Sequence, residues 1–140
     1  MVVGMDTGED LTDNLVQVSF MVIAALTRVA AGHDLSLTQL RVLGILRDRE
    51  PTMAELATYL GLERSTVSGL IDRAAQRGLV HKTGHPEDGR SVRVSLTAEA
   101  QRLATRVTAE IGALTAPLTG RLNSSEQKRL TALLTKVLDR

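Results

Sequence analysis

The chain has 140 residues, of which 43% are hydrophobic and 24% are charged, and its formal net charge is +1. This length and balance are typical of a folded domain with a core of its own rather than of a disordered segment. The absence of cysteine excludes a disulfide framework, a thiolate zinc site and a thiol redox sensor. Phe20 and Tyr59 are the only aromatic residues, too few for a platform that stacks single-stranded nucleic acid.

The first regular element is predicted to be a helix over residues 11–32, after an irregular start over residues 1–10. Its apolar residues recur at spacings of four and three, and Gly32 ends it. The longest apolar run, residues 20–26, is too short to span a bilayer, and no export signal is visible. We therefore expect a cytoplasmic protein that does not enter a membrane.

Three further helices are predicted before residue 80. Ser36 with Gln39 and Thr52 with Glu55 each have the spacing of a capping box, which marks the start of a helix. Glu50-Pro51 separates the first two of these helices. The third is expected over residues 63–77, because Gly78 follows in the position that favours left-handed backbone.

Residues 53–72 fit the requirements of a helix-turn-helix. Two short helices that cross at a tight turn need a small residue at the crossing and a residue tolerant of positive φ in the turn, and Ala57 and Gly61 occupy these positions. Apolar residues must also fill the inner faces. We predict that this inner face consists of Leu56, Leu60, Leu62, Val67, Leu70 and Ala74.

The opposite face of the second of these helices is predicted to contact double-stranded DNA. It presents short hydroxyl side chains near the helix start, which can bond to phosphates or base edges, and a glycine that allows close approach. The face comprises Arg64, Ser65, Ser68, Gly69 and Asp72, with Thr66 and Arg73 at its margins. We expect Asp72 to lie off-centre or to pair with an arginine; the alternative for the whole face is simple solvation.

A β-hairpin is predicted next, with strands over residues 79–82 and 91–96 and a turn-rich segment between them. Arg90 near its tip could enter a minor groove, where the negative potential is enhanced, and Asp88 could hold that guanidinium extended. A surface pair of little energy is the alternative for these two residues. Lys82 and Arg93 add to a local charge of +3 over residues 64–93.

Two helices are predicted to follow, one capped by Thr97 and one that follows Asn123. Pro117 is expected to kink or end the first of them. Heptad-like apolar seams in the first and fifth helices predict a second copy of the chain as their partner. Packing of these seams against each other within one chain is the alternative.

Residues 35–103 resemble the MarR family of winged helix-turn-helix transcription regulators. The resemblance rests on residues 37–43, 56–68, 78–80, 86–91 and 94–97, where Asp88-x-Arg90 matches the wing motif of the family. It implies a mainly α fold with a small β wing, in which residues 35–96 bind DNA and residues 1–34 and 97–140 form a dimerisation region. It also implies a homodimer on a pseudo-palindromic operator, usually a repressor released by a small phenolic or aromatic ligand.

The resemblance and the exposed helix face together give the candidate binding residues. DNA contacts are expected from Thr38, Arg64, Ser65, Thr66, Ser68, Gly69, Arg73, Lys82, Arg90 and Arg93. Phe20, His33 and Tyr59 are the candidates for a ligand pocket.

Two other classes of function compete with this interpretation. A winged helix can instead be a protein–protein interaction module that does not bind DNA. An enzyme is disfavoured because the sequence has no phosphate-binding loop and no nucleophile elbow. His81 and His85 are four residues apart on a predicted strand and turn, where they would not converge on one metal. No cofactor and no metal are expected.

Overall fold

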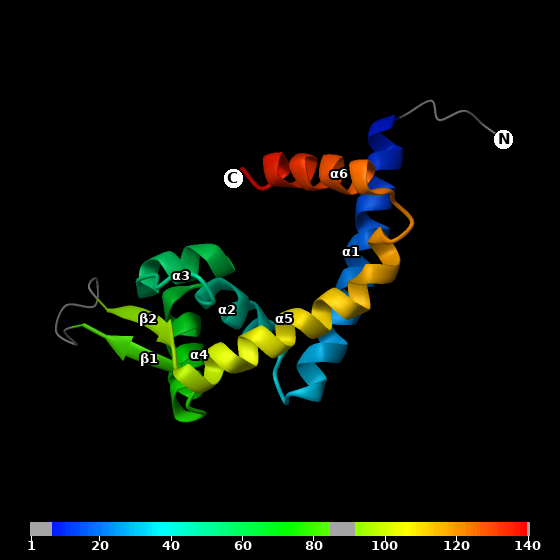
Figure 1. Cartoon of the computed structure of the whole chain (residues 1–140). Coiled ribbons are helices and arrows are strands. Elements are labelled where there is room, and N and C mark those ends of the chain that lie inside the picture. Colours follow the sequence, from blue (N-terminus) through cyan, green and yellow to red (C-terminus); the bar gives the residue numbers. More distant parts are fainter. Residues whose placement is uncertain (1–6, 85–91, 140) are drawn as a thin grey trace. The chain divides into compact units, whose positions relative to one another are not determined.

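The structure is a computed structural model that describes residues 7–84 and 92–139 (Figure 1). Its elements in chain order are α1 (Thr7–Gly32), α2 (Leu37–Leu46), α3 (Met53–Leu60), α4 (Arg64–Gln76), β1 (Val80–Thr83), β2 (Arg93–Leu96), α5 (Ala98–Thr119) and α6 (Ser124–Val137). The chain divides into two units, Leu26–Ala109 and the terminal segments Met1–Ala25 with Glu110–Arg140. This is the mainly helical fold with a small β wing that the sequence predicts.

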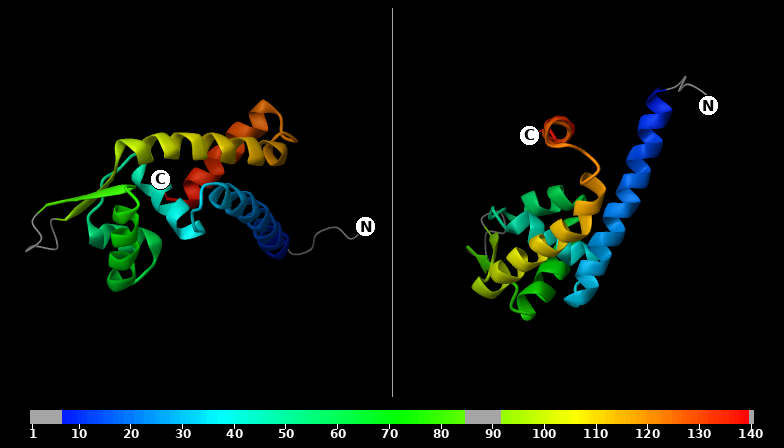
Figure 2. Two further views of the ribbon diagram at one scale, coloured as in Figure 1. Left: turned by 90° about the horizontal axis from the view of Figure 1, so that it is seen from below. Right: turned by 45° about the vertical axis from the view of Figure 1, so that its right-hand side comes forward.

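The unit Leu26–Ala109 contains the hydrophobic core. Figure 2 shows α2, α3 and α4 packed together beside the hairpin. The core consists of aliphatic side chains, and no buried side chain among the described residues is polar. The largest fully buried side chains are Leu56, Ile71, Val67 and Val94. Burying such side chains stabilises the fold by about 1.5–3 kcal/mol each.

Capping boxes start α2 and α3, as predicted. The Ser36 hydroxyl accepts a hydrogen bond from the Gln39 N–H at 3.0 Å, and the Gln39 side chain accepts one from the Ser36 N–H at 2.9 Å. Thr52 and Glu55 make the same reciprocal pair at 3.1 and 3.2 Å. Each box satisfies backbone donors that the first turn of a helix leaves free, so these residues fix where the helices begin.

The turn between α3 and α4 depends on Gly61, which has φ of +66°. Left-handed backbone is easily reached only by glycine, and it lets the Gly61 N–H bond to carbonyls of the last turn of α3. Leu56, Leu60, Val67, Leu70 and Ala74 are buried, as predicted. Leu62 is 38% exposed, so its place on the inner face was wrong. It follows the left-handed residue and lies outside both helices, where helical spacing no longer determines which way a side chain points.

The hairpin pairs β1 and β2 antiparallel, with Val80 opposite Leu96. A third segment extends it, because the Val94 N–H donates to the Pro51 carbonyl at 2.9 Å and the Met53 N–H donates to the Val92 carbonyl at 3.2 Å. The strands begin one or two residues later than predicted. Residues 85–91, including Asp88 and Arg90 of the predicted wing tip, lie outside the described residues.

The terminal helices differ from prediction at their ends. α1 begins at Thr7, not at residue 11, and Glu9 and Asp10 in its first turn favour this earlier start because carboxylates stabilise a helix N-terminus. α5 includes Pro117 and continues to Thr119, so the proline does not end the helix where it stands. Thr97 caps α5 through a 3.1 Å bond from the Ala100 N–H, and Asn123 with Glu126 caps α6.

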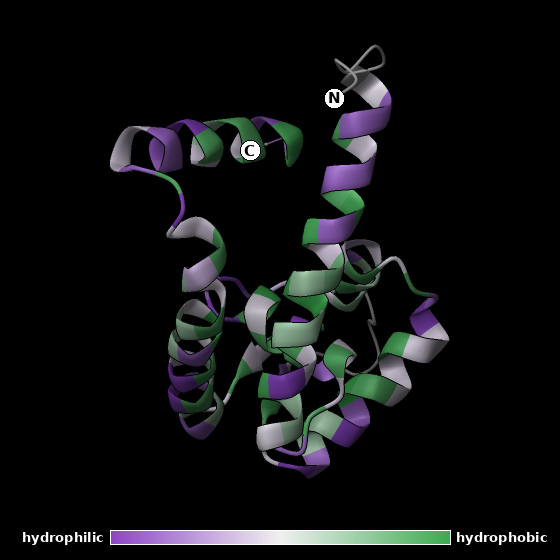
Figure 3. Ribbon diagram, turned by 90° about the vertical axis from the view of Figure 1, so that its right-hand side faces the viewer, coloured by the Kyte–Doolittle hydropathy of each residue, from purple (hydrophilic) through white to green (hydrophobic). Residues whose placement is uncertain are grey.

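The unit formed by the terminal segments has almost no core of its own. Every buried residue in the described chain belongs to Leu26–Ala109, whereas large apolar side chains along α1 and α6 are exposed. Figure 3 shows hydrophobic residues recurring along both helices. The exposed residues include Leu11, Leu15, Phe20, Leu133, Leu134 and Val137.

By length and composition alone, Gly8–Gly32 of α1 is apolar enough to cross a membrane, with a mean hydropathy of 1.7 over its most apolar window. This differs from the expectation drawn from the run at residues 20–26, because the whole helix carries few charges. One such helix is weak evidence for a membrane span, since core helices and signal sequences have the same character. In each of these cases, another apolar surface would have to cover the exposed apolar side chains of α1.

The contrast between Leu56 and Leu62 gives a stability prediction. Leu56→Ala removes a side chain with 0% exposure and should lower the free energy of unfolding by about 2–5 kcal/mol. Leu62→Ala, the matched control at a 38% exposed position, should cost about 1 kcal/mol or less. Urea unfolding followed by circular dichroism measures both. An equal loss of unfolding free energy in the two variants would mean that Leu62 also packs on the inner face.

Candidate nucleic-acid interface

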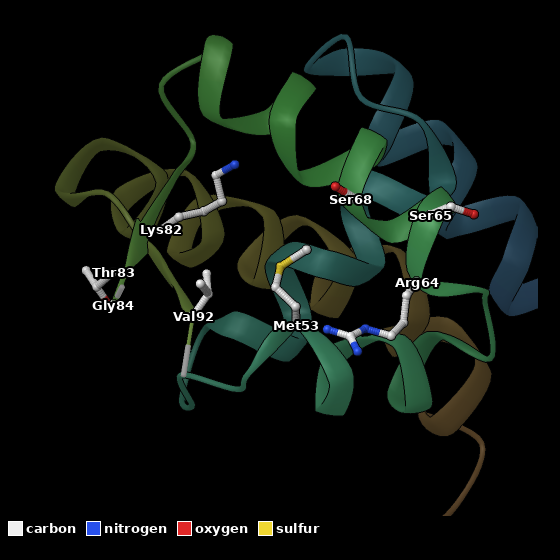
Figure 4. A pocket seen from close by; sticks show the side chains of 8 residues that line it. All are labelled: Met53, Arg64, Ser65, Ser68, Lys82, Thr83, Gly84 and Val92. Atoms are coloured by element: carbon white, nitrogen blue, oxygen red, sulfur yellow. The ribbon is translucent and has the colours of Figure 1, made fainter. Parts of the chain in front are cut away.

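An open hollow of about 490 Å³ lies within the unit Leu26–Ala109, between α4, the start of α3 and the hairpin (Figure 4). Arg64 at the start of α4 and Lys82 on β1 enter it from opposite sides, with Met53 between them. Its lining residues are Met53, Arg64, Ser65, Ser68, Lys82, Thr83, Gly84 and Val92. Two cations and three hydroxyls therefore surround a shallow surface that suits an anion.

The exposed face of α4 follows from what its other face buries. Val67 and Ile71 have 0% exposure, and at 100° per residue their burial directs Ser65, Ser68 and Asp72 outward. Gly69 is half-buried between them. A Cβ at Gly69 would lie 3.4 Å from a guanidinium nitrogen of Arg73, so the Arg73 side chain folds back over this glycine.

Asp72 was expected to lie off-centre or to pair with an arginine, and it pairs with a lysine. Lys82 Nζ donates to Asp72 Oδ1 at 2.5 Å, which joins β1 to the outer face of α4. The arginine alternative was wrong, because the register of the hairpin against α4 decides which cation reaches the carboxylate. Arg73, the next residue along the helix, points over Gly69 instead.

Arg93 fixes the base of the hairpin to the loop before α3. Its Nη1 donates to the Glu50 carbonyl at 2.9 Å and lies 3.9 Å from a carboxylate oxygen of Glu55. This predicted DNA contact is therefore engaged within the protein. Thr38 in the first turn of α2 and Thr66 in the first turn of α4 are exposed, but neither lines the hollow.

The three candidate ligand residues lie on different elements and differ in exposure. Phe20 on α1 is 68% exposed, and Tyr59 on α3 is 41% exposed with the Arg49 guanidinium 5.2 Å above its ring. His33 is half-buried in the turn after α1. None of the three lines the hollow beside α4 or the smaller hollow lined by Val42, Leu70 and Val80.

Two arginines that the sequence did not single out bond to backbone carbonyls at the end of α3 and in the turn after α1. Arg41 Nη2 donates to the Tyr59 carbonyl at 2.6 Å, and Arg77 Nη1 donates to the Asp34 carbonyl at 2.7 Å. Asp34 has φ of +55°, which non-glycine residues rarely adopt. Free carbonyls at a helix end favour a nearby cation, but sequence spacing does not show which distant arginine supplies it.

Comparison with known proteins identifies the family. The model of the MarR family matches residues 33–91. The HTH-type transcriptional repressor NicR of Pseudomonas putida is 30% identical over 111 residues, which cover 79% of this chain and 70% of NicR. The chain belongs to the MarR family.

Other known proteins are similar over different extents. The uncharacterized HTH-type transcriptional regulator YfiV of Bacillus subtilis is 34% identical over 71 residues, which cover 50% of this chain and 44% of YfiV, so the match spans less than half of that relative. The fold matches that of CouR from Rhodococcus jostii RHA1, solved bound to p-coumaroyl-CoA, with a TM-score of 0.77 and 23% identity over 96% of this chain and 95% of CouR.

NicR and YfiV are named as a transcriptional repressor and a transcriptional regulator. The helix-turn-helix predicted over residues 53–72 lies inside the matched segment, and so do the residues that line the hollow up to Gly84. In the described part of the chain no three His, Asp or Glu side chains gather where they could hold a metal ion.

The pKa of Glu55 gives a test of how the start of α3 is held. Its pKa is lowered, mainly by the hydrogen bond from the Thr52 backbone N–H, then by the Thr52 side chain and by the attraction of Arg93. The carboxylate therefore contributes stability that is present above the ordinary glutamate pKa of about 4.3 and is lost as the pH falls through the lower folded value.

Glu55→Gln should lower the thermal midpoint at neutral pH and flatten its fall below about pH 4.3. Thermal unfolding at a series of pH values measures this, and Glu99→Gln in the first turn of α5 is the control for removing a carboxylate elsewhere. A pH profile of Glu55→Gln that matches the wild type would mean that the capping carboxylate does not stabilise the fold.

Proposed function

We propose that the protein regulates transcription, as a repressor, by binding double-stranded DNA as a homodimer. The observation that carries the proposal is the position of Arg64, Ser65 and Ser68 on the exposed face of α4, at a hollow whose far side holds Lys82. Burial of Val67 and Ile71 keeps that face outward. A helix with such a face fits the major groove of B-form DNA.

The side chains expected to contact DNA differ in the groups that they can bind. Arg64 has no partner among the described residues, so its guanidinium is available for a phosphate or for the edge of a guanine. Ser65 and Ser68 offer short donors and acceptors that require close approach, which the small Gly69 permits. We include Arg90 as the minor-groove contact of the wing on the sequence argument, since it lies outside the described residues.

Dimerisation through residues 1–34 and 97–140 is the second part of the proposal. The unit formed by the terminal segments buries no side chain of its own in the described chain, although Leu15 is 56% exposed and Leu133 is 51% exposed. A second copy related by a two-fold axis would cover this surface and present two copies of α4. A two-fold reader of DNA needs such copies about one helical turn of the duplex apart.

We also propose that the protein represses transcription in the cytoplasm and responds to a small effector. Repression is supported by the name of NicR, and a response to a small aromatic or phenolic effector is supported by CouR, which was solved bound to p-coumaroyl-CoA. Phe20, His33 and Tyr59 remain the candidate effector residues. We place the protein in the cytoplasm, where it would have access to DNA.

DNA binding is tested by footprinting the protein on the DNA that flanks its own gene and by measuring affinity against salt. Arg64→Gln should weaken binding to every duplex and reduce the slope of log affinity against log salt by about one per bound protomer, because one phosphate contact is lost. Arg106→Gln, at an exposed position of α5 that does not line the hollow, should keep the wild-type slope. A wild-type protein without salt-dependent binding would instead indicate a protein–protein module.

Dimerisation is tested by sedimentation velocity at micromolar concentration, where the mass should be twice 15.1 kDa. Leu134→Glu on α6 should shift the protein toward monomer, because it puts a charge into the apolar surface that the partner covers. Lys128→Glu alters charge at an exposed polar position of the same helix and should remain dimeric. Wild-type protein that sediments only as monomer would overturn this part of the proposal.

A further inference from the structure

The exposed face of α4 carries a carboxylate where a DNA-binding surface needs cations. Asp72 lies about two helical turns beyond Ser65 and therefore on the same face. Its Oδ1 accepts the hydrogen bond from Lys82 Nζ at 2.5 Å, and both side chains stay in contact with solvent, at 54% and 42% exposure. The cation that lines the hollow from the hairpin side is therefore already paired within the protein.

Two uses of this carboxylate can be separated by geometry. A free aspartate on a helix in the major groove could accept a hydrogen bond from the amino group of cytosine. Asp72 is not free, because one of its oxygens holds Lys82 and draws that side chain toward α4. An aspartate that holds an interface lysine has a different effect, since it removes that lysine from the set of cations that bind phosphates.

We propose that Asp72 is a positioning residue that sets the strength and the salt dependence of DNA binding by holding Lys82. The inference rests on the proposed function. A second N–H of Lys82 could donate to a phosphate while the first stays on Asp72, but the carboxylate would then lie close to that phosphate, and its repulsion would offset the attraction of the ammonium. The lysine therefore stays with Asp72, and the interface releases one counterion fewer per protomer than its sequence suggests.

This arrangement has a consequence for a regulator. Phosphate contacts supply nearly all of the sequence-independent affinity of a DNA-binding protein. A lysine that is paired within the protein does not add to that affinity, so the affinity is lower than with a free lysine. Arg64, Ser65 and Ser68 stay in place for the remaining contacts. The complex is accordingly easier to dissociate, and its affinity changes less with ionic strength.

The test is a double-mutant cycle on the full chain, with a duplex of scrambled sequence as the probe and affinity measured over a range of salt concentrations. Asp72→Asn should steepen the slope of log affinity against log salt by about 0.9 per bound protomer. Affinity should then rise roughly eightfold per protomer at about 0.1 M salt. It should equal that of the wild type at about 1 M salt, because a slope difference of about 0.9 changes affinity roughly eightfold over a tenfold range of salt.

Lys82→Gln alone should lower affinity, because it leaves Asp72 near the phosphates without its partner, but it should keep the wild-type slope nearly unchanged, since Lys82 releases no counterion in the wild type. Asp72→Asn combined with Lys82→Gln should return to the wild-type slope. Asp48→Asn is the matched control. Asp48 is, like Asp72, an exposed carboxylate paired with a cation, but its partner Arg49 does not line the hollow, whereas Lys82 does. Both residues of the pair are exposed, so circular dichroism should show all variants folded.

Each other outcome contradicts the proposal in its own way. An equal rise from Asp72→Asn with or without Lys82 would mean general repulsion of DNA by the carboxylate. A loss of affinity for the footprinted site would mean that Asp72 contacts a base. No change would mean that the pair has no effect on binding. If neither the wild type nor any variant bound DNA in a salt-dependent way, the proposed function itself would fail.

Discussion

The burial of one face of α4 is the constraint on which the rest of the structure depends. Val67 and Ile71 are completely buried against α3 and the rest of the core. An α-helix with one face fixed in this way has its opposite face fixed as well, so the outward position of Ser65 and Ser68 is a consequence of packing. The polar surface is thus preorganised, and binding to DNA would not carry the entropy cost of ordering α4.

Pairing within the protein decides which cations of this surface remain available. Net charge counts Arg64, Lys82 and Arg93 alike, yet Lys82 is held by Asp72 and Arg93 by the Glu50 carbonyl. Arg64 has no partner in the described part of the chain. The local charge of +3 over residues 64–93 therefore overstates how many cations face a ligand, and the contact geometry corrects it.

The sequence predicted what depends on neighbours along the chain and missed what depends on distant ones. Capping boxes, the glycine turn and the buried stripe of α4 are set within a few residues, and the structure confirms each. Leu62 was misplaced because helical spacing does not continue through the left-handed Gly61. The Lys82 partner of Asp72, and the bonds of Arg41 and Arg77 to distant carbonyls, depend on how α2, α4 and the hairpin come together. No local pattern encodes those contacts.

The two units differ in how many of their own apolar side chains they bury. Leu26–Ala109 has a complete core, whereas the terminal segments leave Leu15 and Leu133 exposed and have no core of their own among the described residues. A second copy would supply the missing apolar partner and would also double every contact with DNA. Because free energies add over the two half-sites, a roughly eightfold effect per protomer becomes an effect of about sixtyfold in the dimer. A single carboxylate on α4 would then have a large influence on how firmly the regulator holds DNA, although the ion pair it makes contributes little to the stability of the fold.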